Sequence, residues 1–147
     1  MTSEDLPYVI IYTDGACDPN PGPGGWAALL LSGRKEKVLT GSEQSTTNNR
    51  MELTAAIRAL QVLNKPCRID IYTDSEYLKR GITEWLPAWR KRNWKRKGGA
   101  LANLDLWQAL DAAVKSHSVN WNWLRGHTGH HENERVDRLA RQAIKRG

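Results

Sequence analysis

The sequence contains no long apolar run and few cysteines. Its longest apolar run, Trp26 to Leu31, is far shorter than the ~20 residues that a membrane-spanning helix needs. The first seven residues include two acids and no basic residue, unlike an export signal. The two cysteines, Cys17 and Cys67, match no disulfide framework or zinc-binding spacing. We therefore expect a cytoplasmic protein that is not attached to a membrane.

Repeats, low-complexity tracts and linker-like segments are also absent from the 147 residues. A chain of this length can bury roughly 68–70% of its unfolded surface in a single core. The hydrophobic fraction of 39% and the charged fraction of 26% are ordinary for a soluble globular protein. We expect one domain that spans residues 1–147.

Acidic residues are missing between Trp85 and Leu104, where basic residues are dense. Six of the eight residues from 90 to 97 are basic. Their six positive charges equal the formal net charge of the whole chain, +6. Tryptophans 85, 89 and 94 alternate with them. The pattern fits a solvated helix face whose tryptophans point to the core. It fits better a nucleic-acid contact, in which cations meet phosphates and a tryptophan meets a sugar or base.

The hydrophobic periodicity predicts an α/β fold. Expected strands cover residues 8–14, 25–31, 37–42, 68–73 and 119–124, and a loop covers 18–25 (DPNPGPGG). Expected helices cover residues 49–64, 75–80, 83–92, 104–115 and 133–145. The order β-β-β-α-β-α-β-α, with the middle helices counted as one unit, predicts a five-stranded mixed sheet with helices packed on its faces.

Four carboxylates have positions that bring them to one edge of this sheet. Asp14 ends the first predicted strand and Asp74 follows the fourth, and the helix between them is long enough for a crossover. If the two strands are parallel neighbours, both aspartates lie at the edge where open α/β sheets bind ligands. Glu52 and Asp137 are expected in the first turns of their helices and need only face the same edge.

Each of these acids also has a structural interpretation. Asp14 could belong to an Asp-Gly turn, and Asp74 could cap the next helix. Glu52 could complete a capping box with Asn49 as N-cap. Asp137 could be a solvated acid balanced by nearby arginines. Taken together, however, gathered carboxylates repel one another unless a hard divalent cation binds their oxygens.

A two-metal phosphodiesterase site follows from such a cluster. One ion activates water and the other stabilises the leaving oxygen. His127 lies in the predicted loop at 125–131 (RGHTGHH), where a histidine could relay protons. A zinc site made of His127, His130 and His131 is disfavoured because no cysteine is nearby and the spacing is weak.

Several motifs, in this order, resemble bacterial ribonuclease HI. They extend over nearly the whole chain, from Tyr8 to about Ala143. The matching segments are residues 12–15 (YTDG), 20–25 (NPGPGG), 46–53 (TTNNRMEL), 72–75 (YTDS), 105–107 (DLW), 126–130 (GHTGH) and 132–137 (ENERVD). Any one motif could occur by accident, whereas the ordered set is specific.

The resemblance implies the ribonuclease H fold and a monomeric endonuclease that cleaves the RNA strand of RNA–DNA hybrids. It implies products with 5′-phosphate and 3′-hydroxyl ends. It makes Asp14, Glu52, Asp74 and Asp137 the ligands of two Mg²⁺ ions, with Mn²⁺ as a possible substitute. His127 becomes the mobile residue that aids turnover.

The resemblance also assigns substrate contacts. Asparagines in the hybrid's minor groove would pair with base edges and 2′-hydroxyls. Thr47 and Asn103 would bind a phosphate of the DNA strand, and segment 85–98 would be a basic protrusion. The full implied set is Cys17, Asn20, Thr47, Asn48, Asn49, Glu76, Trp85, Trp89, Lys91, Lys95, Arg96, Lys97 and Asn103. Glu76 departs from the pattern because many relatives carry glutamine there.

Two other functions remain open at this point. A non-catalytic hybrid-binding module would keep the fold and the basic segment but would be expected to have lost carboxylates. A DNA-directed nuclease of the same fold, such as a transposase, integrase or junction-resolving enzyme, would keep the carboxylates. The asparagines at Asn48 and Asn49 argue for reading of the 2′-hydroxyl and hence against a DNA substrate.

Overall fold

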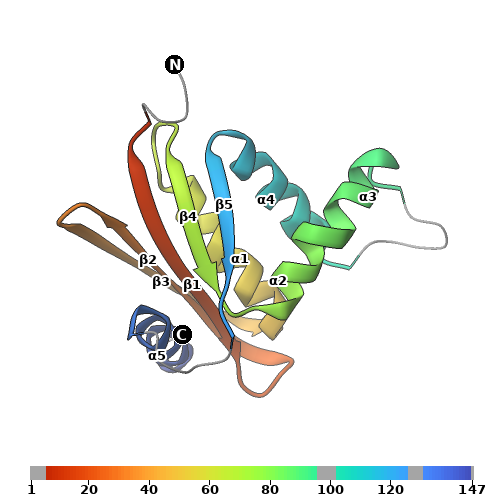
Figure 1. Ribbon diagram of the computed structural model, residues 1–147. Coiled ribbons are helices and arrows are strands. Elements are labelled where there is room, and N and C mark those ends of the chain that lie inside the picture. Colours follow the sequence, from red (N-terminus) through yellow and green to blue (C-terminus); the bar gives the residue numbers. More distant parts are fainter. Residues whose placement is uncertain (1–5, 96–101, 126–130, 147) are drawn as a thin grey trace.

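A five-stranded mixed sheet forms the centre of the computed structural model, which describes residues 6–95, 102–125 and 131–146 (Figure 1). Its strands lie in the order β3-β2-β1-β4-β5. The first three pair antiparallel, and β1–β4 and β4–β5 pair in parallel. This confirms the predicted sheet. The strands are β1 (Tyr8–Cys17), β2 (Gly22–Ser32), β3 (Lys35–Thr46), β4 (Arg68–Thr73) and β5 (Ser118–Trp123).

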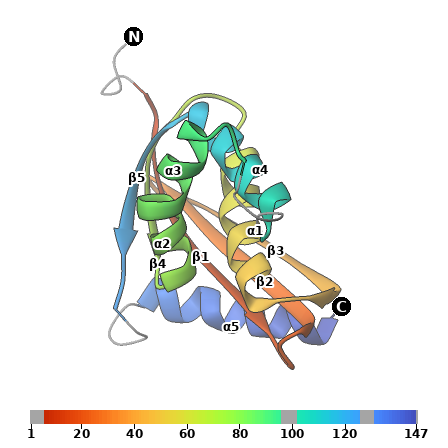
Figure 2. The same ribbon diagram turned by 90° about the vertical axis from the view of Figure 1, so that its right-hand side faces the viewer.

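Helices cover both faces of the sheet. Helices α1 and α4 pack on one face and α5 crosses the other, beneath β1, β2 and β3 (Figures 1 and 2). Across the described parts of the chain, no helix combines the length and apolar character needed to cross a membrane. The helical elements are α1 (Asn48–Gln61), α2 (Glu76–Arg80), the π-helical stretch η2 (Gly81–Trp85), α3 (Leu86–Lys91), α4 (Leu104–Lys115) and α5 (His131–Arg146).

The apolar run in β2 is continuous because both faces of that strand are buried. Ala28 and Leu30 pack into the core on the α1 side, whereas Leu29 packs against Val136 and Ala140 of α5. Each fully buried Leu or Ile side chain contributes about 1.5–3 kcal/mol through removal of apolar surface from water. The sheet is therefore held from both sides, which fixes the edge where the carboxylates lie.

Several predicted strand boundaries are wrong. The third strand, predicted at 37–42, covers Lys35–Thr46. β1 continues past Asp14 to Cys17, and β2 begins at Gly22, inside the predicted loop 18–25. The reason is the antiparallel ladder, which extends as far as the pair Cys17 and Gly24. Cross-strand pairing outweighs the turn-like composition of the glycines and prolines.

Helix starts also differ from the predictions. Thr47 caps α1, and its hydroxyl accepts the Arg50 N–H at 3.2 Å. Asn49 is therefore not the cap, and Glu52 lies beyond the first turn, free of any capping box. Helix α5 begins at His131, which places Asp137 in its second turn.

The chain does not leave the helical conformation at Gly81, where an interruption was predicted. Glycine lowers helix stability but does not by itself end a helix. The backbone widens into η2 instead and then continues as α3. Helices α2, η2 and α3 therefore form one arm that extends away from the sheet (Figure 1).

Candidate active site

Strand register places Asp14 beside Asp74. The parallel ladder between β1 and β4 ends at the pair Tyr12 and Tyr72, whose rings stack with centroids 4.9 Å apart. Asp14 lies two residues beyond Tyr12 in β1, and Asp74 directly follows Thr73, the last residue of β4. This confirms that the first and fourth strands are parallel neighbours and brings both carboxylates to one edge.

Gly15 brings Glu52 to the same edge. A Cβ atom at Gly15 would lie 2.4 Å from the backbone nitrogen of Glu52 and 2.4 Å from the carbonyl carbon of Met51. Only glycine therefore lets α1 approach β1 this closely. The YTDG motif thus supplies Asp14 and, in the next residue, the space that α1 needs.

A second close approach places Asp137. A Cβ at Gly25 would lie 2.3 Å from the Ala140 carbonyl oxygen, so α5 rests directly on β2. Asp137, one turn before Ala140, then faces Asp14. Arg141 donates to the Asp137 carboxylate at 3.2 Å.

All four carboxylates line one pocket of about 280 Å³. Its walls come from β1, α1, the residue after β4, and α5. The lining residues are Asp14, Gly15, Ala16, Asn48, Glu52, Asp74, Asp137 and Arg141. The structure thus joins the four acids that the sequence singled out, together with one of the predicted substrate asparagines.

The electrostatics of the pocket disfavour full ionisation. Burial raises the pKa of Asp14 to about 9, and the neighbouring carboxylates of Asp74 and Asp137 add to that effect. Burial also raises the pKa of Glu52 to about 7, although hydrogen bonds from Ser75 and Asn48 oppose the shift. Asp14 is only 6% exposed, so water cannot relieve the repulsion. A bound cation would relieve the repulsion between the carboxylates.

The donor set has the chemistry of a magnesium site, since four carboxylates offer the hard oxygen ligands that Mg²⁺ binds. Two of the acids also accept hydrogen bonds from protein groups. Glu52 accepts from Asn48 at 2.8 Å and from Ser75, and Asp137 accepts from Arg141. Within the described ranges, no three His, Cys, Asp or Glu side chains are already placed to hold one metal ion. The residues fit the ion by chemistry and by common location.

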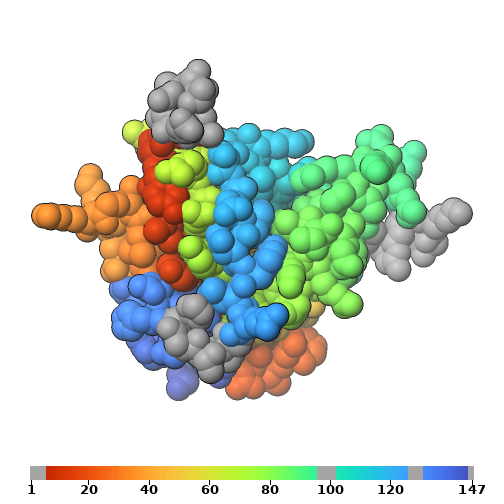
Figure 3. All heavy atoms as spheres, in the orientation of Figure 1, coloured from red at the N-terminus to blue at the C-terminus, as the bar shows by residue number. Residues whose placement is uncertain are grey.

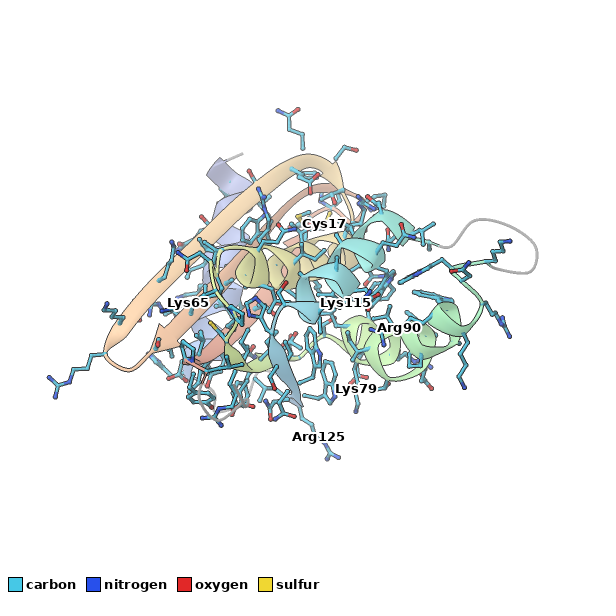
Figure 4. The ribbon with its side chains drawn as sticks, turned by 90° about the horizontal axis from the view of Figure 1, so that it is seen from above. Cys17, Lys65, Lys79, Arg90, Lys115 and Arg125 are labelled. Atoms are coloured by element: carbon cyan, nitrogen blue, oxygen red, sulfur yellow. The ribbon has the colours of Figure 1, made fainter. Side chains whose placement is uncertain are left out.

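The predicted minor-groove residues surround the α1 N-terminus. Asn20 is exposed, and its side-chain oxygen accepts the backbone N–H of Asn48 at 3.1 Å. Asn49 is exposed and Thr47 is half-buried. The half-buried Cys17 sulfur lies 3.3 Å from the carbonyl oxygens of residues 19 and 22, so it braces the loop between β1 and β2 (Figure 4).

Asn103 is held by a hydrogen-bond chain that the sequence did not reveal. Arg50 donates to the Asn103 side-chain oxygen at 3.2 Å and makes a two-pronged ion pair with Asp105. The Asn103 amide donates to the Tyr77 hydroxyl at 2.8 Å, which also accepts from Trp107. The chain links the starts of α1 and α4 to the α2–η2–α3 arm.

The tryptophans of the basic segment serve the core as well as the surface. Trp85 and Trp89 are half-buried and lie 6.3 and 5.8 Å from the Trp107 ring, with Trp94 against Trp89. The core-facing interpretation is thus correct for their inner faces. Arg90, one of the six basic residues at 90–97, is paired with the buried Asp111 and points from α3 to α4 (Figure 4).

The remaining predicted contacts lie outside the pocket. Glu76, Lys91 and Lys95 are exposed on or beside the arm, which stands out from the body in Figure 3. Three predicted residues, His127, Arg96 and Lys97, lie outside the described residues. Sequence reasoning missed Arg141 and Ser75 as site residues. The available signals were the position of Ser75 in the motif at 72–75 and the position of Arg141 one helical turn after Asp137.

Comparison with known proteins gives one family. The family model described as RNase H matches residues 7–145. A ribonuclease H of Bradyrhizobium diazoefficiens is 57% identical over 141 residues, which cover 95% of this chain and 92% of that protein. A ribonuclease H of Methylococcus capsulatus is 56% identical over 143 residues, covering 97% and 92% respectively.

Solved structures agree with the sequence relatives. LC9-RNase H1, a type 1 RNase H with the type 2 active-site motif, is 38% identical with a TM-score of 0.86, covering 95% of this chain and 73% of that one. LC11-RNase H1, crystallised in complex with RNA/DNA hybrid, is 21% identical with a TM-score of 0.71 and coverages of 94% and 97%. At that identity the second comparison shows the fold alone.

Proposed function

The chain belongs to the ribonuclease H family, and on this premise we propose that it is an endonuclease that hydrolyses the RNA strand of RNA–DNA hybrids. The observation that carries the proposal is the single pocket lined by Asp14, Glu52, Asp74 and Asp137. LC11-RNase H1, which shares the fold, has been crystallised with such a hybrid. We further propose that residues 1–147 act as one domain and as a cytoplasmic monomer.

The four carboxylates would hold two Mg²⁺ ions, or Mn²⁺ as a substitute. When bound, the ions would activate water and stabilise the leaving oxygen, giving 5′-phosphate and 3′-hydroxyl ends. Support comes from the chemistry of the four oxygen-bearing side chains and from their common pocket. Burial of Asp14, with the nearby carboxylates of Asp74 and Asp137, raises the pKa of Asp14 to about 9, and a bound cation would offset the repulsion among these acids. Arg141 keeps Asp137 oriented toward the pocket.

Substrate selection would rest on the asparagines at the α1 N-terminus. Asn49 and Asn20 are exposed beside the pocket, where side-chain amides can pair with base edges and the 2′-hydroxyl. Asn48 lines the pocket itself. Thr47 and Asn103 would bind a phosphate of the DNA strand, with Asn103 kept in place by Arg50 and Tyr77.

The α2–η2–α3 arm would guide the hybrid. Trp85 and Trp89 would present their exposed edges to the DNA strand, with Lys91 and Lys95 beside phosphates. We propose that Arg96 and Lys97 also bind phosphates of the hybrid and that His127 relays protons during turnover. Cys17 and Glu76 would border the groove, where the acidic Glu76 would weaken hybrid binding relative to a glutamine.

Asp14→Asn tests the proposal most simply, because it keeps shape and removes a ligand charge. We expect cleavage of a labelled hybrid to be lost at every Mg²⁺ concentration while circular dichroism stays that of the parent. Full activity in this variant would refute the assignment. Analysis of the parent's products for 5′-phosphate ends checks the chemistry.

A DNA-directed nuclease is the main rival, since it would use the same carboxylates. Incubation of the enzyme with a hybrid and, separately, with a four-way DNA junction distinguishes the two. We expect cleavage of the hybrid only. Cutting of the junction at a comparable rate would favour the rival.

A further inference from the structure

Ser75 lies between the end of β4 and the start of α2, directly after Asp74, and is 4% exposed. Its hydroxyl makes two contacts. The oxygen accepts the Leu78 N–H at 3.0 Å, which caps α2, and the hydroxyl hydrogen bonds to the Glu52 carboxylate. The Ser75 backbone N–H is also fixed, because it donates to the Thr73 hydroxyl at 3.1 Å.

The direction of the contact with Glu52 follows from hydrogen-bond chemistry. A hydroxyl has one proton and two lone pairs. Because Leu78 donates a backbone N–H, Ser75 must use a lone pair there, which leaves its proton for the Glu52 carboxylate. The cap and the carboxylate contact therefore use different parts of one oxygen and can coexist.

The second oxygen of Glu52 is held independently. Asn48 donates to it from one turn earlier in α1, at 2.8 Å. Glu52 thus has one donor on its own helix and one on the neighbouring β4–α2 junction. A glutamate side chain has several free torsions, and two donors on separate elements restrict them together.

We propose that the Ser75 hydroxyl is a positioning residue for Glu52, fixing the carboxylate of α1 to the strand end that carries Asp74. The inference rests on the proposed function, in which Glu52 is a metal ligand. Residues that orient metal ligands commonly contribute 10–100-fold in metal affinity or activity. A role limited to capping α2 would contribute only to stability.

Three substitutions separate the two roles. Ser75→Thr keeps both cap and donor, and Ser75→Ala loses both. Ser75→Gly removes the hydroxyl donor but lowers the stability of the capped helix by only a few tenths of a kcal/mol. We expect Ser75→Gly and Ser75→Ala to weaken Mg²⁺ binding to the metal-free protein about tenfold in calorimetry. Ser75→Thr should bind as the parent does.

Lys79→Gly is the matched control, because Lys79 is exposed in α2 and the change weakens that helix by about 1 kcal/mol. Its Mg²⁺ affinity should equal the parent's. Equal weakening by Lys79→Gly and Ser75→Gly would overturn the proposal, since the effect would then come from helix stability.

A double-variant cycle gives the decisive readout. In a Glu52→Gln background, Ser75→Gly should change Mg²⁺ affinity by less than about twofold, because the group that Ser75 positions is no longer a carboxylate. An undiminished tenfold effect there would overturn the proposal. Failure of the parent to cleave hybrids would instead count against the proposed function and leave these binding measurements unaffected.

Discussion

At the scale of single residues, the site is defined by the burial of Asp14. Its carboxylate lies under 10% exposed beside two other acids, so its charge is disfavoured in the absence of a cation. Glu52 shows the same tendency more weakly because Ser75 and Asn48 donate to it. A bound cation would offset the part of this effect that comes from repulsion between the acids.

Stability of the metal-free protein should therefore fall as the pH rises. A carboxyl group whose pKa is raised on folding holds its proton more tightly in the folded chain, so its contribution is greatest below the unfolded pKa of about 4. That contribution is lost as the pH increases toward about 9 for Asp14 and about 7 for Glu52. Urea unfolding in EDTA between pH 5 and pH 9 measures this slope.

Asp14→Asn should remove most of the slope and raise the free energy of unfolding at pH 8, because asparagine carries no charge that burial and the neighbouring acids disfavour. The same variant should be inactive. A pH slope unchanged from the parent's would mean that Asp14 is ionised without cost.

The sequence predicted where the charged residues lie better than it predicted which residues they contact. The register of Asp14 and Asp74 follows from two apolar strands and one crossover helix, all visible as periodicity. The bond from Ser75 to Glu52 and the Arg90–Asp111 pair join residues 23 and 21 positions apart. No local pattern encodes such contacts, because they depend on the final packing of separate elements.

At the scale of elements, the close approach of α1 to β1 is the feature that assembles the site. Gly15→Ala places a methyl group 2.4 Å from the α1 backbone, so helix and strand must separate. We expect a loss of at least about 2 kcal/mol in the free energy of unfolding and of most activity, measured by urea titration and hybrid cleavage.

Gly33→Ala is the matched control for this substitution. Gly33 has φ +60° and nothing within 4 Å of an added Cβ, so its cost of about 1 kcal/mol comes from backbone strain alone. Its cleavage rate should match the parent's. If Gly15→Ala kept full activity, the close contact would not be what positions Glu52.

The arm is anchored to the body through Asp111. Its carboxylate is 8% exposed and accepts from Arg90 on α3. Asp111→Ala should lower the free energy of unfolding by about 1–3 kcal/mol, the usual effect of removing a hydrogen bond to a charged group. It should also raise the Michaelis constant for the hybrid, because α3 would no longer be fixed on α4.

Glu84→Ala provides the comparison, since it breaks the exposed pair with Arg80 within the same arm. That change should cost at most about 0.5 kcal/mol and leave the Michaelis constant unchanged. Equal effects from the two variants would show that the Arg90–Asp111 pair has no special role.

Element ends were the least predictable part of the fold. The segment at 22–25 looks like a loop, yet Gly24 and Gly25 pair with β1 and Gly22 pairs with β3, so it forms part of a strand. The cap of α1 is Thr47 rather than Asn49, although both residue types cap helices well. Propensity does not distinguish such neighbours, and the tertiary position of the helix decides.

At the scale of the whole molecule, basic residues are concentrated in the sequence segment 90–97, which begins in α3. Replacing Lys95, Arg96 and Lys97 with glutamine should weaken hybrid binding and flatten its salt dependence by up to about three units of slope. Binding titrations from 50 to 200 mM salt measure this directly.

Three lysines at the other end of the molecule, Lys35, Lys37 and Lys65, give a control with the same change in net charge. They line a separate pocket, and Lys65 lies on the opposite side from α3 in Figure 4. Their replacement should leave the salt slope nearly unchanged. If the two triple variants behaved alike, net charge rather than the basic segment 90–97 would govern binding.

If the pocket of four carboxylates cleaves RNA in hybrids with the help of a divalent cation, cleavage should require both the hybrid and the ion. The most direct test gives the parent protein a hybrid with labelled RNA and a DNA duplex of the same sequence, each with Mg²⁺ and with EDTA. We predict RNA fragments from the hybrid with Mg²⁺ and no product in the other three reactions. Cleavage of the hybrid in EDTA would show that no divalent cation is needed, and cleavage of duplex DNA at a similar rate would show that RNA is not the selected strand.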